Sequence, residues 1–185
     1  MTETRRLYYE DVYKKEFTAT VLECRERKKG FAVILDESAF YPEGGGQPSD
    51  VGTLGDAQVT EVHEKDGELL HYTDKALEVG ARVEGKIDWA RRFDLMQQHS
   101  GEHMVSGIIH EKYGYDNVGF HMGSDVITVD LNGLLDETQL KEIEQEVNEK
   151  IWEDKEVEIT YPTAAELEAL DPPPRNSPEA AHRDR

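Results

Sequence analysis

Two histidines four residues apart, His99 and His103, are the side chains whose spacing most clearly suggests chemistry in this sequence. On an α-helix, residues four apart lie on one face with Cβ atoms about 6 Å apart, so both imidazole rings can hold one divalent cation such as zinc. A zinc protease would need glutamate directly after the first histidine, and Ser100 stands there, which excludes that class. Because the same spacing also occurs in ordinary surface or core histidines, the pair alone predicts only half of a metal site.

A helix over residues 88–113 is predicted to position both rings. Apolar and polar residues interleave along this segment, Asp88 suits the N-cap, and Gly114 suits the end of the helix. Apolar and small residues share the side of the helix that carries the histidines, which indicates the wall of a partly buried pocket. These residues are Leu95, Met96, Ser106 and Gly107.

A small β-barrel is predicted before this helix. Five short β-like segments are separated by turn residues, and no helical pattern lies between them. These segments are residues 17–22, 31–35, 58–62, 69–72 and 81–87. The loop of residues 40–52 contains three consecutive glycines, which let the backbone approach a partner or adopt positive φ. It is not a phosphate-binding loop, because the Gly-Lys-Ser/Thr sequence and the βαβ context are missing.

An α+β layer is predicted from the long helix onward. The expected order is helix, strand, helix, strand, helix, so the fold class is α+β with an N-terminal barrel. The later elements are a strand at 126–131, a helix with the stripe Leu140, Ile143, Val147 and Ile151 after a capping box of Asp136 and Gln139, a strand through Val157, Ile159 and Tyr161, and a helix opened by Thr163 and Glu166. Residues 171–185 are rich in proline and charge and are predicted to be a disordered tail. The domain prediction is a barrel over 1–87, the α+β layer over 88–170 and the tail.

The charge balance is strongly acidic, with 40 acidic against 21 basic residues and a net charge of −19. A polyanion would be repelled by the chain as a whole. Two local clusters, Arg25 to Lys29 and Arg91-Arg92, could still meet phosphates or could be solvated turn residues, and both interpretations stay open. The absence of a long apolar run or a signal peptide, together with the single Cys24, predicts a soluble cytoplasmic protein with no membrane partner.

Three motifs stand in one order along the chain: Phe-Tyr-Pro-Glu-Gly-Gly-Gly-Gln-Pro-Ser-Asp at 40–50, Gln-Gln-His-Ser-Gly-Glu-His at 97–103 and Gly-Phe-His-Met-Gly at 119–123. With them, roughly residues 17–170 resemble the AlaX-type alanyl-tRNA editing proteins, which are similar to the editing domain of alanyl-tRNA synthetase. The resemblance implies a trans-editing hydrolase that deacylates seryl- or glycyl-tRNA(Ala), with the tRNA acceptor end as its partner.

The resemblance also implies roles for individual residues. His99 and His103 match the first two zinc ligands, Gly45, Gly46 and Gln47 match a loop associated with the tRNA acceptor end, and His121 matches a residue of the amino-acid pocket. Hydrolysis of the ester needs a positioned water and a charge sink for the oxyanion, and zinc could supply either or anchor the substrate. The group that activates water is not assigned.

The sequence departs from the family at the second pair of zinc ligands. A Cys-x3-His is expected after the second strand of the editing domain, and none follows His103. Cys24 lies in the other domain, while His121 is assigned to the pocket and His182 to the tail. We therefore expect impaired zinc retention and activity, and a truncation or frame shift near Asp171. Two alternatives stay open, namely a tRNA-binding module without catalysis and an inactive fragment.

Overall fold

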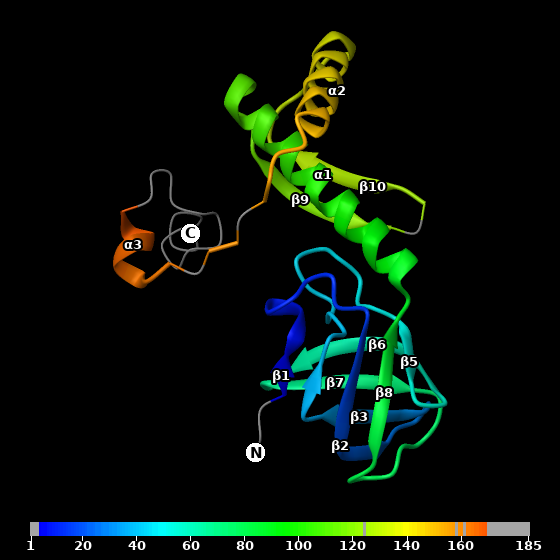
Figure 1. Ribbon diagram of the computed structural model, residues 1–185. Helices are drawn as coiled ribbons and strands as arrows, with labels where there is room; N and C mark the ends of the chain where they lie inside the picture. Colours follow the sequence, from blue (N-terminus) through cyan, green and yellow to red (C-terminus); the bar gives the residue numbers. More distant parts are fainter. Residues whose placement is uncertain (1–3, 124, 158, 161, 170–185) are drawn as a thin grey trace. The chain divides into compact units, whose positions relative to one another are not determined.

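A computed structural model describes residues 4–123, 125–157, 159–160 and 162–169 of the chain (Figure 1). The described residues fall into two compact units, one up to Val147 and one from Asn148 onward. The strands are β1 (Arg5–Arg6), β2 (Glu16–Glu26), β3 (Phe31–Leu35), β4 (Glu37–Ser38), β5 (Gly52–Leu54), β6 (Ala57–Lys65), β7 (Glu68–Thr73), β8 (Arg82–Ile87), β9 (Asn117–Met122) and β10 (Ile127–Leu131). The helices are the 3₁₀ turn η1 (Leu7–Tyr9), α1 (Trp89–Tyr113), α2 (Glu137–Trp152) and α3 (Ala164–Glu168). None of the described helices is long and apolar enough to span a membrane.

The predicted barrel is confirmed as a closed barrel in the order β2-β3-β7-β6-β5-β8. All neighbouring strands in it are antiparallel, and β8 pairs back with β2, as Figure 1 shows. Inward side chains fill the interior, and the most buried are Val21, Val33, Leu35, Leu54, Val62 and Leu69. The sequence did not indicate β1, β4 or β5, because strands of two or three residues are too short to carry an alternating pattern. It also did not indicate β9, so the described order after the barrel is helix, strand, strand, helix, helix in place of the predicted helix, strand, helix, strand, helix.

The long helix α1 begins and ends where the sequence predicts. The Asp88 carboxylate accepts a hydrogen bond from the Arg91 amide at 3.1 Å, and Gly114 ends the helix with a left-handed φ of 69°. Its C-terminal half packs on the α2 residues Ile143 and Val147 and on Leu131 of β10 through Ile108 and Ile109. This second core supports the antiparallel pair β9–β10, which two strands alone would leave only marginally stable.

The predicted α2 helix forms, with a narrower buried stripe than expected. Asp136 and Gln139 exchange two hydrogen bonds of 2.9 Å, which confirms the capping box. Only Ile143 and Val147 of the stripe are buried, while Leu140 and Ile151 are about half exposed. The spacing of apolar residues in the sequence therefore predicted a wider buried face for α2 than the structure has.

The predicted strand through Val157 and Ile159 is wrong for the residues that the structure describes there. Residues 157, 159 and 160 form no strand, and Val157 is 85% exposed. An alternating pattern makes a strand only where it finds a pairing partner, and the described residues 157, 159 and 160 pair with no strand. The capping pair Thr163 and Glu166 does open the short helix α3. Tyr161 and the predicted tail at 171–185 lie outside the described residues, and the proposed domain boundary at residue 87 stays a prediction.

A buried ion pair attaches the start of α1 to the end of the glycine-containing loop. The Arg92 guanidinium donates to both oxygens of the Asp50 carboxylate at 2.6–3.0 Å, and its Nη2 also donates to the Ala39 carbonyl at 2.9 Å. Both side chains are almost fully buried. Burial raises the pKa of Asp50, and the charge of Arg92 opposes that rise. The loop's second end is therefore fixed to the helix that carries the histidines.

Inside the barrel, His71 links three separate segments. Its Nδ1 donates to the Val33 carbonyl at 3.1 Å, so in the neutral ring Nε2 accepts from the Ser38 hydroxyl at 2.8 Å. The same hydroxyl accepts from the Phe40 amide at 3.1 Å, where the loop begins. Because no solvent reaches His71, burial lowers its pKa from 6.5 to about 4.

This buried histidine predicts a pH-dependent loss of stability. The unfolded chain protonates residue 71 near pH 6.5 and the folded chain only near pH 4, so stability is present above pH 6.5 and is lost as the pH falls toward 4. The loss should reach about 3 kcal/mol. It is measured as the difference between the wild type and His71→Asn in urea unfolding at each pH, with the partly exposed His63→Asn as control. Equal losses in the wild type and His71→Asn would contradict the prediction.

The Arg92–Asp50 pair predicts a large cost for removing one partner. Arg92→Met leaves a buried carboxylate without its cation, so we expect a loss of about 3–5 kcal/mol in the free energy of unfolding. Arg25→Met is the matched control, because its ion pairs with Glu23 and Glu68 are exposed and are worth about 0–1 kcal/mol. Adding Asp50→Asn to Arg92→Met should recover part of the loss. Equal losses in the two single variants would overturn this account.

Candidate functional site

The site is built around a tight turn in the glycine-containing loop. Gly44 and Gln47 exchange backbone hydrogen bonds of 3.0 and 3.1 Å, with Gly45 and Gly46 between them at φ of 59° and 80°. Positive φ at both central positions is what a type I′ turn requires, and glycine adopts it without strain. The turn exposes the backbone of its two central glycines and directs the Gln47 side chain inward.

The Gln47 side chain joins this turn to α1. Gln47 is only 5% exposed, and its Oε1 accepts a hydrogen bond from His99 Nδ1 at 2.8 Å. Burial and the neighbouring His103 lower the pKa of His99, so the neutral imidazole is favoured. The structure thus brings together two groups, the histidine and the glycine turn, that lie 52 residues apart in the sequence.

The two predicted ligands His99 and His103 lie beside each other, as their spacing on α1 requires. Their rings stack with centroids 5.0 Å apart and planes 16° apart. Their surroundings differ, since His99 is partly buried while the side chain of His103 is 75% exposed. His103 therefore forms the outer, solvent-facing member of the pair.

A buried carboxylate that the sequence reasoning missed lies beneath His103. Glu102 accepts hydrogen bonds from the Ser106 hydroxyl and from Asn117 Nδ2, the latter at 2.6 Å. Its second oxygen lies 3.6 Å from His103 Nδ1. The i,i+4 spacing of Glu102 and Ser106 was a signal for the first of these contacts. No local pattern pointed to Asn117, because it belongs to β9.

Phe120, rather than His121, contacts the histidine and the turn. The Phe120 ring lies 5.3 Å from the His99 ring, and a Cβ added at Gly46 would come within 2.6 Å of Phe120 Cδ1. Successive residues of a strand point to opposite faces, and His121 is exposed. Among the described residues, no hydrogen bond, ion pair or ring contact joins His121 to His99, His103 or Gln47. The pocket role of His121 stays a prediction.

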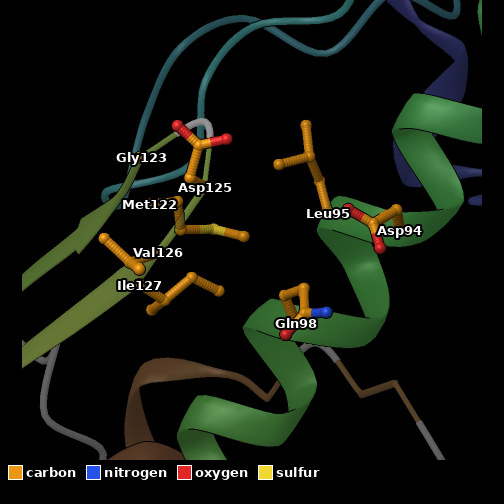
Figure 2. Close-up of a pocket in the computed structure, with 8 residues that line it drawn as sticks. All are labelled: Asp94, Leu95, Gln98, Met122, Gly123, Asp125, Val126 and Ile127. Carbon is orange, nitrogen blue, oxygen red and sulfur yellow. The ribbon is translucent and has the colours of Figure 1, made fainter.

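A cavity of about 190 Å³ lies between α1 and the turn that joins β9 and β10. Figure 2 shows Met122 and Ile127 extending from the strands toward the helix, which contributes Leu95 and Gln98. Two carboxylates, Asp94 and Asp125, also line the cavity. Its lining therefore combines apolar side chains with carboxylate acceptors that suit a small cationic or hydroxyl group. The cavity lies close in sequence to the histidine pair, because Gln98 directly precedes His99.

The two basic clusters, Arg91-Arg92 and Arg25 to Lys29, have different surroundings in the structure. Arg92 is used in the buried pair with Asp50, and Arg91 donates to the Ser49 carbonyl at 2.6 Å, so this cluster holds the loop. Arg25 is paired with glutamates on the barrel surface. Lys28 and Lys29 are exposed at the turn between β2 and β3 and remain available for phosphate contacts.

A structural zinc site takes four nitrogen, sulfur or oxygen ligands, and the two histidines offer imidazole nitrogens. A histidine that donates from Nδ1 to an amide oxygen presents a lone pair at Nε2, which suits a metal ligand. Within the described ranges, however, no cluster of three or more His, Cys, Asp or Glu side chains could hold a metal. A tetrahedral zinc site needs four ligands, and among the described residues the two candidates His99 and His103 have no third or fourth such side chain beside them.

The contact between the turn and Phe120 gives a matched pair of substitutions. Gly45→Ala and Gly46→Ala both force alanine into positive φ, at a cost of about 1–2 kcal/mol. At Gly46 the new Cβ also meets Phe120, whereas at Gly45 the nearest atom, His99 Cε1, is 3.8 Å away. We expect Gly46→Ala to lower the free energy of unfolding further, by about 1 kcal/mol, because overpacking adds to the backbone strain. Urea unfolding measures both losses, and equal losses would contradict the predicted contact.

Comparison with known proteins places these motifs in a family. Residues 2–91 match the family of tRNA synthetases class II (A). The chain is 37% identical over 156 residues to the alanyl-tRNA editing protein Aarsd1 of Mus musculus, covering 76% of this chain and 38% of that protein. It is 35% identical over 161 residues to the alanyl-tRNA editing protein AlaX-L of Pyrococcus horikoshii, covering 83% and 40% respectively.

Alanine–tRNA ligase gives a longer match. The chain is 38% identical over 182 residues to the ligase of Halobacterium salinarum, covering 91% of this chain and 20% of the ligase. It therefore spans less than half the length of each of these relatives. With its glycine turn, its histidine pair and these matches, the chain belongs to the AlaX-type alanyl-tRNA editing family.

Proposed function

We propose that the chain acts in alanyl-tRNA editing, as a deacylase that hydrolyses the ester of seryl- or glycyl-tRNA(Ala). The names of its relatives support the editing function. The observation that carries the proposal is the hydrogen bond from His99 to Gln47, because it puts the paired imidazoles beside the exposed glycine turn. A metal-ligating pair and a backbone surface for an RNA end would then lie at one place.

The proposed reaction is a simple ester hydrolysis. Water adds to the ester carbonyl carbon, the bond from that carbon to the ribose oxygen breaks, and the ribose hydroxyl and the free amino acid are released. His99 and His103 would supply two zinc ligands, and the bound ion would polarise the carbonyl or acidify water. Phe120 and the turn cover one side of His99, which limits the approach of bulk water to that side.

The RNA would be held by local features of an acidic protein. The exposed Gly45-Gly46 backbone offers amide groups to phosphate or ribose oxygens. Tyr13, Trp89 and Phe93 form a partly exposed aromatic cluster at the start of α1, and Lys15 Nζ lies 4.8 Å from the Trp89 ring centroid. Aromatic faces beside a cation suit the stacking of unpaired bases. His121 would line the amino-acid pocket.

A tRNA-binding module without catalysis is the second candidate. It is favoured by the two-ligand donor set, since half of a site should hold zinc far more weakly than the roughly 10–16 kcal/mol of a complete structural site. The two candidates differ in whether the chain hydrolyses the ester with the help of its histidines or only binds the tRNA.

Deacylation assays discriminate between the candidates. We expect the 185-residue chain to release serine or glycine from mischarged tRNA(Ala), and His99→Ala or His103→Ala to slow release at least tenfold, about 1.4 kcal/mol of barrier. His110→Ala is the matched control, because this exposed histidine of α1 pairs with Asp116 away from the turn. Release at the uncatalysed rate, with tRNA affinity kept by the histidine variants and lost in Lys28→Ala/Lys29→Ala, would favour the binding module.

Metal analysis tests the cofactor separately. We expect substoichiometric zinc in the purified chain, and none above background in a His99→Ala/His103→Ala variant, because two imidazoles alone bind weakly. Gel filtration and thermal melting of both proteins show whether they are folded monomers or aggregates, which is the behaviour expected of an inactive fragment. Full zinc occupancy in the double variant would rule out these two histidines as the ligands.

A further inference from the structure

The hydrogen bond between Gln47 and His99 has a fixed direction. The acceptor is the amide oxygen Oε1, which has no proton to give, so the proton on the shared axis belongs to His99 Nδ1. A neutral imidazole carries only one N–H, and a proton at Nδ1 leaves a lone pair at Nε2.

The Gln47 side chain has little freedom to turn away. It is nearly fully buried and follows a turn closed by two backbone hydrogen bonds. Phe120 packs against both Gly46 and the His99 ring, so the ring that donates the bond is held on the side of the turn. The amide oxygen is therefore held at the ring nitrogen before any ligand arrives.

His103 lacks an equivalent arrangement. Its nearest acidic partner, Glu102, lies 3.6 Å from Nδ1, which is too long for a hydrogen bond. The Glu102 carboxylate is also held in place, because Ser106 and Asn117 donate to its other oxygen. The ring is also mostly exposed. Of the stacked pair, only His99 has a side-chain acceptor within hydrogen-bond distance among the described residues.

We propose that Gln47 is a positioning residue that fixes His99 as its Nδ1–H tautomer and so presents the Nε2 lone pair to a divalent cation or a substrate hydroxyl. The use of that lone pair rests on the proposed function, while the tautomer does not. The glycine loop then has a second task, since the residue that ends its turn also orients the ring on α1.

Two substitutions separate this role from a merely structural one. Gln47→Met keeps the length and much of the volume of the side chain but removes the acceptor. Gln47→Glu keeps an acceptor at the same reach. If Gln47 only links the loop to the helix, the protonated nitrogen of His99 should be the same in every folded variant, whereas tautomer control should be lost in Gln47→Met and retained in Gln47→Glu.

The primary measurement is the tautomer itself. In the metal-free chain with ¹⁵N-labelled histidine, the Nδ1 and Nε2 shifts of His99 report which nitrogen is protonated, and His99→Ala assigns the signals. At a pH high enough for the His99 ring to be neutral in every variant, we expect Nδ1–H in the wild type and in Gln47→Glu, and the mixture of a free imidazole in Gln47→Met. Nε2–H in the wild type, or an unchanged ring in Gln47→Met, would overturn the proposal.

Zinc binding supplies a second readout. Titration of zinc alone against a chromophoric chelator should show affinity about 10–100-fold lower in Gln47→Met than in the wild type, and largely restored in Gln47→Glu. Thermal melting checks that each variant is folded, and if Gln47→Met is not, the wild-type tautomer and Gln47→Glu still decide. Failure of deacylation with the Nδ1–H tautomer intact would count against the proposed function and not against this role of Gln47.

Discussion

The buried ion pair between Arg92 and Asp50 is the constraint on which the geometry of the site depends. Two charges removed from water are tolerable only when each is fully hydrogen-bonded, and here the guanidinium uses both carboxylate oxygens and a backbone carbonyl. The Asp88 amide and the Arg91 side chain add hydrogen bonds to residues 51 and 49. The first turn of α1 thus fixes the end of the glycine-containing loop, while Ser38 and His71 fix its beginning.

Because both of its ends are held, the loop can contain a tight turn with two residues at positive φ and still be well ordered. Gly45 and Gly46 adopt conformations that other residues resist, and Phe120 fills the space where a side chain would otherwise project. The turn then delivers Gln47 to His99. The site is consequently a product of the junction between barrel and helix, and neither element contains it alone.

Local patterns in the sequence predicted the elements well and the contacts between them poorly. The caps of α1 and α2 depend on residues within four positions of each other, and both formed as expected. The strand expected near Val157 failed because a strand also needs a pairing edge, which alternation does not encode. Arg92 was grouped with Arg91 as a candidate phosphate contact, since nothing near it in sequence reveals the carboxylate that buries it.

The candidate site shows the same division. The stacking of His99 and His103 follows from helical spacing, and the resemblance supplied the glycine turn as a separate motif. Three contacts could be seen only in the tertiary structure: the hydrogen bond from His99 to Gln47, the packing of Phe120 on His99, and the hydrogen bonds of the buried Glu102. In sequence the two histidines look equivalent, whereas in the fold one is screened and oriented and the other is open to solvent.

Arg92 and His99 are seven residues apart on α1, so the helix fixes the position of the His99 imidazole relative to the barrel. Seven residues fall only about 20° short of two full turns, so an anchor on the barrel side sets the direction of the ring two turns later. One residue inserted between them would rotate the ring by about 100° and carry it about 1.5 Å along the axis, away from the loop. The distance between these two residues in the chain is therefore as much a part of the site as the side chains themselves.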